Sequence, residues 1–201
     1  MIRFNQIIFL VLVLLLVGCA ATGPSGDSDA SLIAKDLPKV DPKIAAEYEA
    51  ALSVMRSGKI AQAESALRQL AEKYPNFSGP RANLGILYFH ENKLDQAKSE
   101  FHEALKINPK NVVSLNHLGI ISRGDGKFKE AHSFYEKALQ IDHNYAYAHL
   151  NFGILLELYM GKLNEALGHY ERYQELRKAE GKDEDKDVAK WIVDLSRRAK
   201  K

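Results

Sequence analysis

Apolar residues recur at helical spacing between residues 44 and 180, and the pattern repeats itself along the chain. Each period contains two apolar stripes of helical spacing, separated by a Gly or Asn that tolerates the left-handed backbone of a tight helix end. The separating residues lie 34, 34 and 35 positions apart (92−58, 126−92, 161−126), and a lysine follows each: Gly58, Asn92, Gly126 and Gly161. The pattern predicts four helix–turn–helix units, at 44–77, 78–111, 112–145 and 146–180.

Further columns keep the same register, and each holds residues of similar character. The columns are Ala63, Ala97, Ala131 and Ala166; Leu67, Phe101, Tyr135 and Tyr170; Leu70, Ala104, Ala138 and Tyr173; and Ala50, Leu84, Leu118 and Phe152, each of the last followed by Ala or Gly. Small residues let two helices approach closely where they cross, and large residues fill the adjacent space. One helix pair cannot bury its apolar face alone, so the columns predict that the units stack around a continuous core.

The end of the chain predicts one more helix. In DKDVAKWIVDLSRRAK, four apolar residues fall at i, i+3, i+4 and i+7: Val188, Trp191, Ile192 and Leu195. The opposite face is charged, as on a helix that covers the end of a stack. Acidic residues at its start and basic residues at its end suit the helix dipole. We expect Gly181 to end the preceding helix, residues 181–201 to hold this capping helix, and Trp191 to pack against the fourth unit.

The period, the alternation of small and large residues, the turn and the prolines Pro75 and Pro109 resemble the tetratricopeptide repeat (TPR). The resemblance implies an all-α fold, a TPR α-solenoid of four helix-turn-helix repeats within 43–180 with a C-terminal capping helix. The tryptophan-type residue usual in the first helix is replaced in every unit, by Glu47, Arg81, Leu115 and His149. Asn83 and Asn151 match an asparagine common in the family, and we interpret both as structural.

The beginning of the chain predicts export. Residues 1–19 read MIRFNQIIFLVLVLLLVGC, with an unbroken apolar run from Ile7 to Val17. The run is shorter than the roughly 20 residues that a membrane-spanning helix needs, which favours a secretory signal. The letters LVGC, ending at Cys19, resemble the bacterial lipobox; this implies a lipoprotein signal peptide at 1–18 and acyl chains on Cys19, which anchor a protein without a transmembrane helix. An ordinary signal peptide with an unused thiol is the alternative.

Residues 19–42 are rich in Gly, Pro, Ser and Asp, so they predict the lipidated cysteine and a flexible tether. Ala20 and Ala21 follow the cysteine, and neither is the aspartate that resembles an inner-membrane retention signal. We therefore expect a lipid-anchored protein of the bacterial cell envelope, at the outer membrane and facing the periplasm.

Charge and motifs narrow the possible chemistry. The chain has 28 basic and 26 acidic residues, a near balance that gives no electrostatic case for nucleic acid. Cys19 is the only cysteine, so no disulfide can form within one chain. The sequence contains no HExxH motif, no phosphate-binding loop and no nucleophile elbow. We therefore expect no enzymatic activity, cofactor, metal or small-molecule substrate.

The family resemblance places function on the concave side of the stack, which the first helices line. The predicted partner-binding residues there are mostly apolar: Tyr48, Leu52, Met55, Arg56, Ala82, Ile86, Phe89, His90, Asn116, Ile120, Arg123, Leu150 and Ile154. Exposed apolar patches of this kind mark partner sites. The lysine and asparagine array with which some TPR proteins grip a C-terminal carboxylate is absent, so we expect an apolar or amphipathic segment of another protein.

These expectations combine into a lipid-anchored protein–protein interaction scaffold. It resembles TPR lipoproteins of the pilotin type, which help to assemble pili and their secretins. The alternative is a regulator or recruiter of an envelope enzyme, such as a cell-wall synthase, hydrolase or protease. A further alternative is that the tether itself occupies part of the concave side, through Leu32, Ile33 and Leu37.

Overall fold

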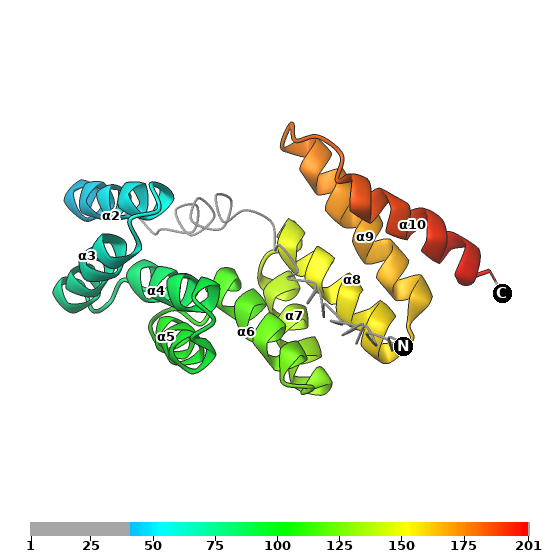
Figure 1. Cartoon of the computed structure of the whole chain (residues 1–201), viewed down its shortest axis with the longest axis horizontal. Coiled ribbons are helices and arrows are strands. Elements are labelled where there is room, and N and C mark those ends of the chain that lie inside the picture. The colour runs from blue at the N-terminus through cyan, green and yellow to red at the C-terminus, as the bar shows by residue number, and fades with distance from the viewer. Residues whose placement is uncertain (1–40, 201) are drawn as a thin grey trace, which may run out of the picture.

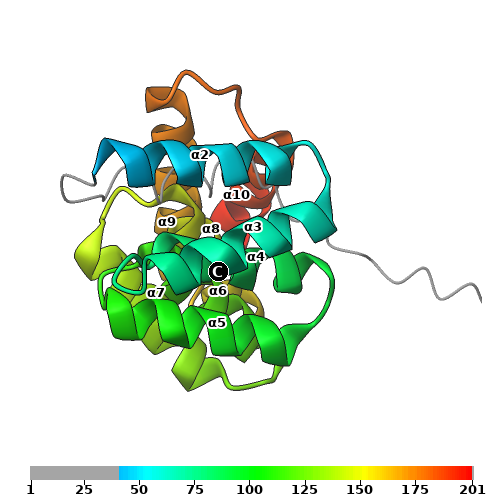
Figure 2. The ribbon, with the colours of Figure 1, turned by 90° about the vertical axis from the view of Figure 1, so that its left-hand side faces the viewer.

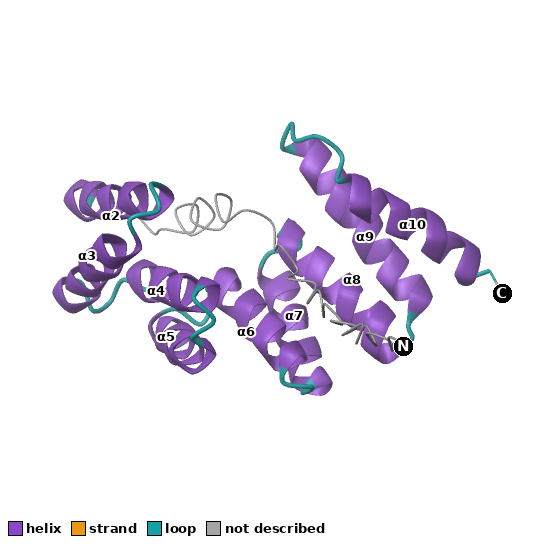
Figure 3. Ribbon diagram, viewed as in Figure 1, coloured by secondary structure: helices purple, strands orange, loops and turns teal. Residues whose placement is uncertain are grey.

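The computed structural model describes residues 41–200. The predicted signal peptide, Cys19 and almost all of the predicted tether lie outside these residues. In the described part every regular element is a helix (Figure 3), which confirms the all-α prediction. The helices are α2 (Pro42–Arg56), α3 (Ile60–Lys73), α4 (Gly79–His90), α5 (Leu94–Ile107), α6 (Val112–Gly124), α7 (Phe128–Ile141), α8 (Ala146–Met160), α9 (Leu163–Ala179) and α10 (Lys186–Arg198).

The helices form four antiparallel pairs that follow one another along an arc (Figure 1). Each second helix packs against the first helix of its own pair and against the first helix of the next pair. First helices also meet directly, α4 with α6 and α6 with α8. Figure 1 shows α2, α4 and α6 toward the inner side of the arc, with α3 and α5 outside them. Seen from the first pair, α2 runs across the view and α9 stands nearly upright, so the stack twists (Figure 2).

The turns inside the pairs have the backbone that the sequence predicts. The separating residues have positive φ angles of 73°, 58°, 73° and 66°, at Gly58, Asn92, Gly126 and Gly161 respectively. Such angles are easy for Gly and tolerated by Asn. Gly181, with φ 71°, likewise follows the end of α9. The periodic glycines and the asparagine therefore end the helices because few other residues can adopt this backbone.

The predicted columns form the core. The four alanines of the first column are fully buried, and the large residues one turn later on the same helices are at most 1% exposed. Ala50 is the exception, because it lies on the first helix of the described residues, which contain no pair before it. It lines a trough of about 340 Å³ between α2 and α3, together with Val54, Ala66 and Leu70.

Three of the small residues are glycines because an aromatic ring occupies the place of a side chain. A Cβ atom on Gly85, Gly119 or Gly153 would lie 2.5–2.6 Å from a ring carbon of Phe101, Tyr135 or Tyr170, respectively. In the first pair the small residue is Ala51 and the large one is Leu67, and both are buried. A smaller neighbour leaves room for the methyl group, so the two columns vary together.

The capping helix α10 packs on α9 and is fixed at both ends. Asp185 accepts hydrogen bonds from the backbone N–H groups of Asp187 and Val188 at 3.1 and 3.2 Å, and the Tyr173 hydroxyl donates to Asp185 at 3.2 Å. At the other end, Arg198 donates to Glu157 of α8 at 2.6 Å. These bonds close the C-terminal end of the stack.

The contact predicted for the only tryptophan is present. The ring of Trp191 on α10 lies 5.6 Å from the ring of Tyr170 in the fourth pair, measured between ring centroids. The side chain is nevertheless 41% exposed. One face of the indole therefore packs on the repeat, and another remains accessible to solvent.

Candidate partner-binding face

The residues predicted to bind a partner divide into two groups. Six are buried, so the prediction that they belong to an exposed surface is wrong: Tyr48, Leu52, Ala82, Ile86, Asn116 and Leu150. The other seven retain solvent contact: Met55, Arg56, Phe89, His90, Ile120, Arg123 and Ile154. A partner can reach only the second group without rearrangement of the stack.

The burial has a physical reason in the spacing of the first helices. Asn83 donates to the hydroxyl of Tyr48, which lies 35 residues earlier, and also to the carbonyl of Gly79 at 3.1 Å. Asn151 repeats this arrangement, donating to Asn116 at 3.1 Å and to the carbonyl of Tyr147 at 2.9 Å. These bonds join successive first helices, so both asparagines have the structural role that the sequence predicted. Residues at the level of Tyr48 and Asn116 therefore lie between helices instead of facing a partner.

Five accessible apolar residues of the first helices make up the set that we call the inner row. It comprises Met55, Phe89, Ile120, Ile154 and Leu158, one or two from each first helix. Leu158 was absent from the prediction although it is 64% exposed, the most exposed of the large apolar residues described. Its spacing of four from Ile154 is the sequence signal that could have identified it. The row runs across all four pairs.

The charged groups near the ends of the first helices differ in their partners. Arg56 donates to Glu49 on its own helix. Arg198 pairs with Glu157, which also accepts from the Tyr170 hydroxyl at 3.1 Å. Arg123 forms no ion pair with any residue between 41 and 200, and its Nη1 atom is buried without a hydrogen-bond partner.

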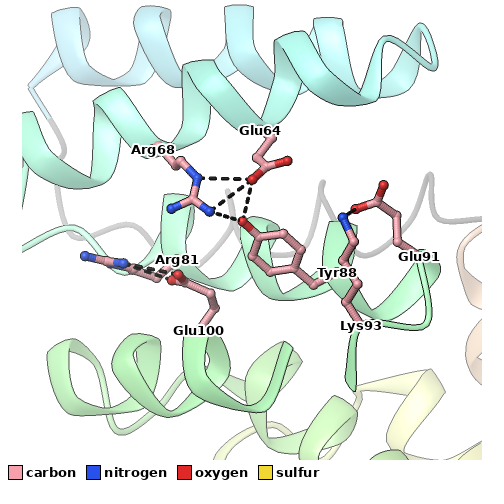
Figure 4. A network of polar contacts seen from close by, with 7 residues as sticks. All are labelled: Glu64, Arg68, Arg81, Tyr88, Glu91, Lys93 and Glu100. Atoms are coloured by element: carbon pink, nitrogen blue, oxygen red, sulfur yellow. Dashed lines mark hydrogen bonds and ion pairs between the residues drawn. The ribbon is translucent and has the colours of Figure 1, made fainter. Parts of the chain in front are cut away.

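A polar network joins the first and second pairs (Figure 4). Figure 4 shows Arg68 and Glu64 of α3 pointing toward Tyr88 of α4, whose hydroxyl donates to Glu64 at 2.6 Å. Arg68 also donates to Glu64, at 3.0 and 3.1 Å. Burial raises the pKa of Tyr88 to about 12, so the phenol remains protonated at neutral pH. These groups are mutually satisfied and stabilise the contact between two pairs.

The same figure shows a second ion pair, between α4 and α5. Arg81 donates to Glu100 at 3.0 and 3.3 Å, and Lys93 pairs with Glu91 at 3.1 Å nearby. Arg81 stands where other TPR units have a tryptophan-type residue. Here the departure from the family pattern is compensated by an ion pair within the same helix pair.

The fold brings two histidines together that are far apart in the sequence. The Nδ1 atoms of His149 on α8 and His169 on α9 are 2.8 Å apart, and His149 Nε2 is 3.0 Å from the carbonyl oxygen of His143. The carbonyl only accepts, so Nε2 of His149 donates to it; in the neutral ring Nδ1 then accepts from Nδ1–H of His169. Burial lowers both pKa values, that of His169 to about 4.

No larger chemical cluster accompanies this pair. Between residues 41 and 200, no group of three or more His, Cys, Asp or Glu side chains is arranged to hold a metal ion. In the same part of the chain, no helix is both long enough and apolar enough to span a bilayer. The face formed by the inner row and Arg123 is the candidate site for a partner.

Comparison with known families identifies the repeats. Two tetratricopeptide-repeat models match the sequence, one over residues 54–115 and the other over residues 112–141. A search of curated proteins gives no match. The matched residues run from the end of α2 to the end of α7 and include the second and third helix pairs completely.

Solved structures share the fold. PilF of Pseudomonas aeruginosa superposes with a TM-score of 0.66 at 24% identity, over 78% of this chain and 69% of PilF. MamA superposes with a TM-score of 0.56 at 17% identity, over 76% of this chain and 86% of MamA. The first TPR domain of Spaghetti (RPAP3), solved with an HSP90 peptide, gives 0.54 at 22% identity, over 62% of this chain and 94% of that domain. This chain carries tetratricopeptide repeats and folds as a TPR-type α-solenoid with a C-terminal capping helix.

Proposed function

We propose that this protein is a non-catalytic, lipid-anchored scaffold of the bacterial cell envelope. It binds an apolar or amphipathic segment of another protein along the inner row. The membrane attachment is through acyl chains on Cys19, and the partner is a periplasmic or outer-membrane protein. TPR domains are protein-interaction modules, and the neighbour solved with an HSP90 peptide is one example.

The observation that carries the proposal is the inner row itself. Phe89, Ile120 and Ile154 are only partly covered, and Leu158 is largely exposed, on helices that bury most of their other apolar residues. Each apolar side chain left in water forgoes roughly 1.5–3 kcal/mol that burial would supply. A partner segment that covers the row recovers part of this free energy, and a row across four pairs is long enough for several turns of helix.

A pair of matched variants tests the binding face. Phe89→Glu combined with Ile154→Glu places two charges in the inner row, whereas Val193→Glu changes a residue that is 53% exposed on α10. Proteins crosslinked to each variant in membranes are identified by mass spectrometry, and circular dichroism verifies the fold. We expect the double variant to lose a partner that wild type and Val193→Glu retain. Equal recovery by all three would refute the inner row as the binding face.

The identity of that partner decides between the functions that the sequence suggests. Components of a pilus or secretion complex, to which the sequence resemblance points, would establish an assembly role. A cell-wall synthase, hydrolase or protease would instead establish the recruitment role.

The lipid anchor has an independent test. Cys19→Ser removes the only thiol of the chain. Wild type is expected to incorporate labelled palmitate and to fractionate with membranes, and the variant is expected to do neither. An unchanged distribution of the variant would show that the chain is held by other means, while leaving the inner row open to its own test.

A further inference from the structure

The third pair contains buried hydrogen-bond donors without acceptors, and two of them, Arg123 Nη1 and the Tyr135 hydroxyl, come from its two packed helices. Among the described residues, four side-chain N or O atoms are buried and lack a partner: Asn83 Oδ1, Ser114 Oγ, Arg123 Nη1 and Tyr135 OH. Native proteins satisfy nearly all such atoms, so each exception requires a reason. Three of these four are donors from one helix pair, α6 and α7. Ser114 lies in the first turn of α6, whereas Arg123 lies near its last turn, on the helix that the Tyr135 ring contacts.

Packing between the two helices places the Tyr135 ring one helical turn before Arg123. The Tyr135 ring lies against Gly119, where a Cβ atom would be 2.5 Å from a ring carbon. Arg123 follows Gly119 by four residues, one turn along the same face of α6. Burial raises the pKa of Tyr135, and the positive charge of Arg123 acts in the opposite direction, as expected for a nearby group. The phenol therefore stays protonated at neutral pH and offers its O–H.

The other pairs show which side chains occupy the positions equivalent to Arg123 and Tyr135. In the fourth pair, the residue four after the glycine is Glu157, and its carboxylate accepts from the Tyr170 hydroxyl and from Arg198. In the first two pairs both positions are apolar, Met55 with Leu67 and Phe89 with Phe101. Only the third pair combines a guanidinium with a phenol, and the carboxylate that accepts a tyrosine and an arginine in the fourth pair has no counterpart there.

We propose that Arg123 and Tyr135 receive a carboxylate side chain of the partner, an Asp or Glu with apolar residues on both sides of it. The inference rests on the proposed function, because the carboxylate is part of the segment bound along the inner row. Phe89 lies in the pair before Arg123, and Ile154 and Leu158 lie in the pair after it. Since apolar residues continue in both directions, the carboxylate is internal to the segment.

The depth of the donors supports a side chain over a chain terminus. Arg123 Nη1 and the Tyr135 hydroxyl are covered from solvent, while the Arg123 side chain as a whole is partly exposed. The slender tip of an Asp or Glu side chain reaches below the surface more easily than a C-terminal carboxylate, which carries its own Cα substituents. Hydrogen bonds to a charged acceptor in a covered site are the strong ones.

A peptide selection tests the proposal without knowledge of the natural partner. Random peptides of about a dozen residues, roughly 18 Å long as a helix, are displayed on phage and selected on the purified full-length chain in detergent. Selected sequences are synthesised as C-terminal amides, each with a matched form in which Asp or Glu becomes Asn or Gln. Fluorescence anisotropy then measures Kd for wild type, Arg123→Gln, Tyr135→Phe and the control Arg172→Gln.

We expect the selected peptides to share one acidic residue between apolar residues. Neutralising it should weaken binding to wild type by about tenfold to a hundredfold, and should have little further effect on Arg123→Gln. Arg172→Gln should bind like wild type because Arg172 lies on α9, a second helix, and already pairs with Glu175. Because the critical change is made in the peptide, the test does not depend on the folding of any variant.

The remaining outcomes separate this inference from the proposed function. If selected peptides bind Phe89→Glu/Ile154→Glu poorly but bind Arg123→Gln as well as wild type, the inner row stands and the carboxylate site is rejected. Peptides that need a free C-terminal carboxylate would also reject it. If no peptide is enriched, or if the double variant binds every peptide normally, the proposed function fails as well.

Discussion

The third and fourth helix pairs share one packing geometry but differ in the polar residue that lies one turn beyond it, Arg123 in one and Glu157 in the other. Gly119 lies against Tyr135 as Gly153 lies against Tyr170, at nearly the same distance. In the fourth pair a glutamate satisfies the tyrosine and ties it to the capping helix. In the third pair an arginine stands at that position, and neither its Nη1 nor the tyrosine hydroxyl has an acceptor. The comparison teaches that packing fixes the repeat and leaves the polar positions free for pair-specific roles.

A second position shows the same freedom. His149 and His169 of the fourth pair correspond to Leu115 and Phe134 of the third, 34 and 35 residues earlier (149−115, 169−134). In the second pair the same positions hold the Arg81–Glu100 ion pair. An apolar contact, an ion pair and a histidine pair thus occupy one place in successive repeats. Partner binding and pH response can therefore differ between repeats without any change of fold.

The largest loss of stability should come from disrupting the contact between glycine and tyrosine that the two pairs share. Gly119→Ala puts a methyl group into the Tyr135 ring, which is fully buried and has no room to move. Overpacking costs about 1–3 kcal/mol, and alanine recovers at most about 1 kcal/mol in helix propensity. We expect a net loss of about 1–2 kcal/mol in the free energy of unfolding, measured by urea denaturation.

Two controls accompany this variant. Gly153→Ala should cost a similar amount, because Tyr170 is equally close. Adding Tyr135→Leu to Gly119→Ala copies the Ala51 and Leu67 combination of the first pair and should restore part of the lost stability. A double variant that is less stable than both single variants would contradict the account of paired columns.

The same columns explain how much of the fold the sequence could predict. Ala63 and its equivalents are alike because burial at a helix crossing allows one size, and a constraint of size is visible in a single sequence. The inner row was only partly predicted. Tyr48 and Asn116 are buried by contacts to residues 35 positions later, which depend on how far one repeat is rotated on the next. That rotation is a property of the stack, and no single helix encodes it.

The hydrogen bonds and ion pairs between helices could not be predicted from the sequence for the same reason. One such contact joins residues of three helices, Glu157, Tyr170 and Arg198, and their spacing in the sequence does not predict it. Leu158 differs, since its helical spacing from Ile154 was available in the sequence. Its omission came from stopping the row one turn too early.

The second largest loss of stability should follow from removing the hydroxyl of Tyr170, which has a hydrogen-bond acceptor. Tyr170→Phe removes the hydroxyl that donates to Glu157 at 3.1 Å. Hydrogen bonds to charged groups contribute about 1.5–3 kcal/mol when buried, and the bond to Arg198 remains, so we expect a loss of about 1 kcal/mol. Thermal denaturation of this variant beside Glu157→Gln measures it. Unchanged stability of Tyr170→Phe would show that water replaces the hydroxyl at no cost.

A smaller loss of stability should follow when the pH is lowered. The pKa values of His149 and His169 are lowered in the folded state by burial, that of His169 to about 4, against an ordinary value of 6.5. Below pH 6.5 the unfolded chain therefore binds more protons than the folded chain. The stability that the neutral pair contributes is present above that pH and is lost progressively as the pH falls toward 4.

Comparison with the third pair isolates this contribution. His149→Leu with His169→Phe copies Leu115 and Phe134, and it should reduce the loss of stability between pH 7 and pH 5. Solvent reaches both rings, so we expect a difference of less than about 1 kcal/mol. Urea midpoints at the two pH values measure it, above the range in which most carboxylates titrate. Identical pH dependence of wild type and double variant would show that other groups are responsible.

The smallest effect, and the sharpest contrast with Tyr170→Phe, is expected for Tyr135→Phe. The Tyr135 hydroxyl is buried without an acceptor, so the folded state gains no hydrogen bond from it and bears the cost of removing it from water. Its loss should leave the free energy of unfolding unchanged or raise it by up to about 0.5 kcal/mol, by the same thermal and urea measurements. The two substitutions delete the same atom from equivalent rings, so packing cancels in their comparison. A loss as large as that of Tyr170→Phe would mean that the hydroxyl already has an acceptor in the free protein, and the proposed pair of donors for a partner's carboxylate would then be reduced to Arg123.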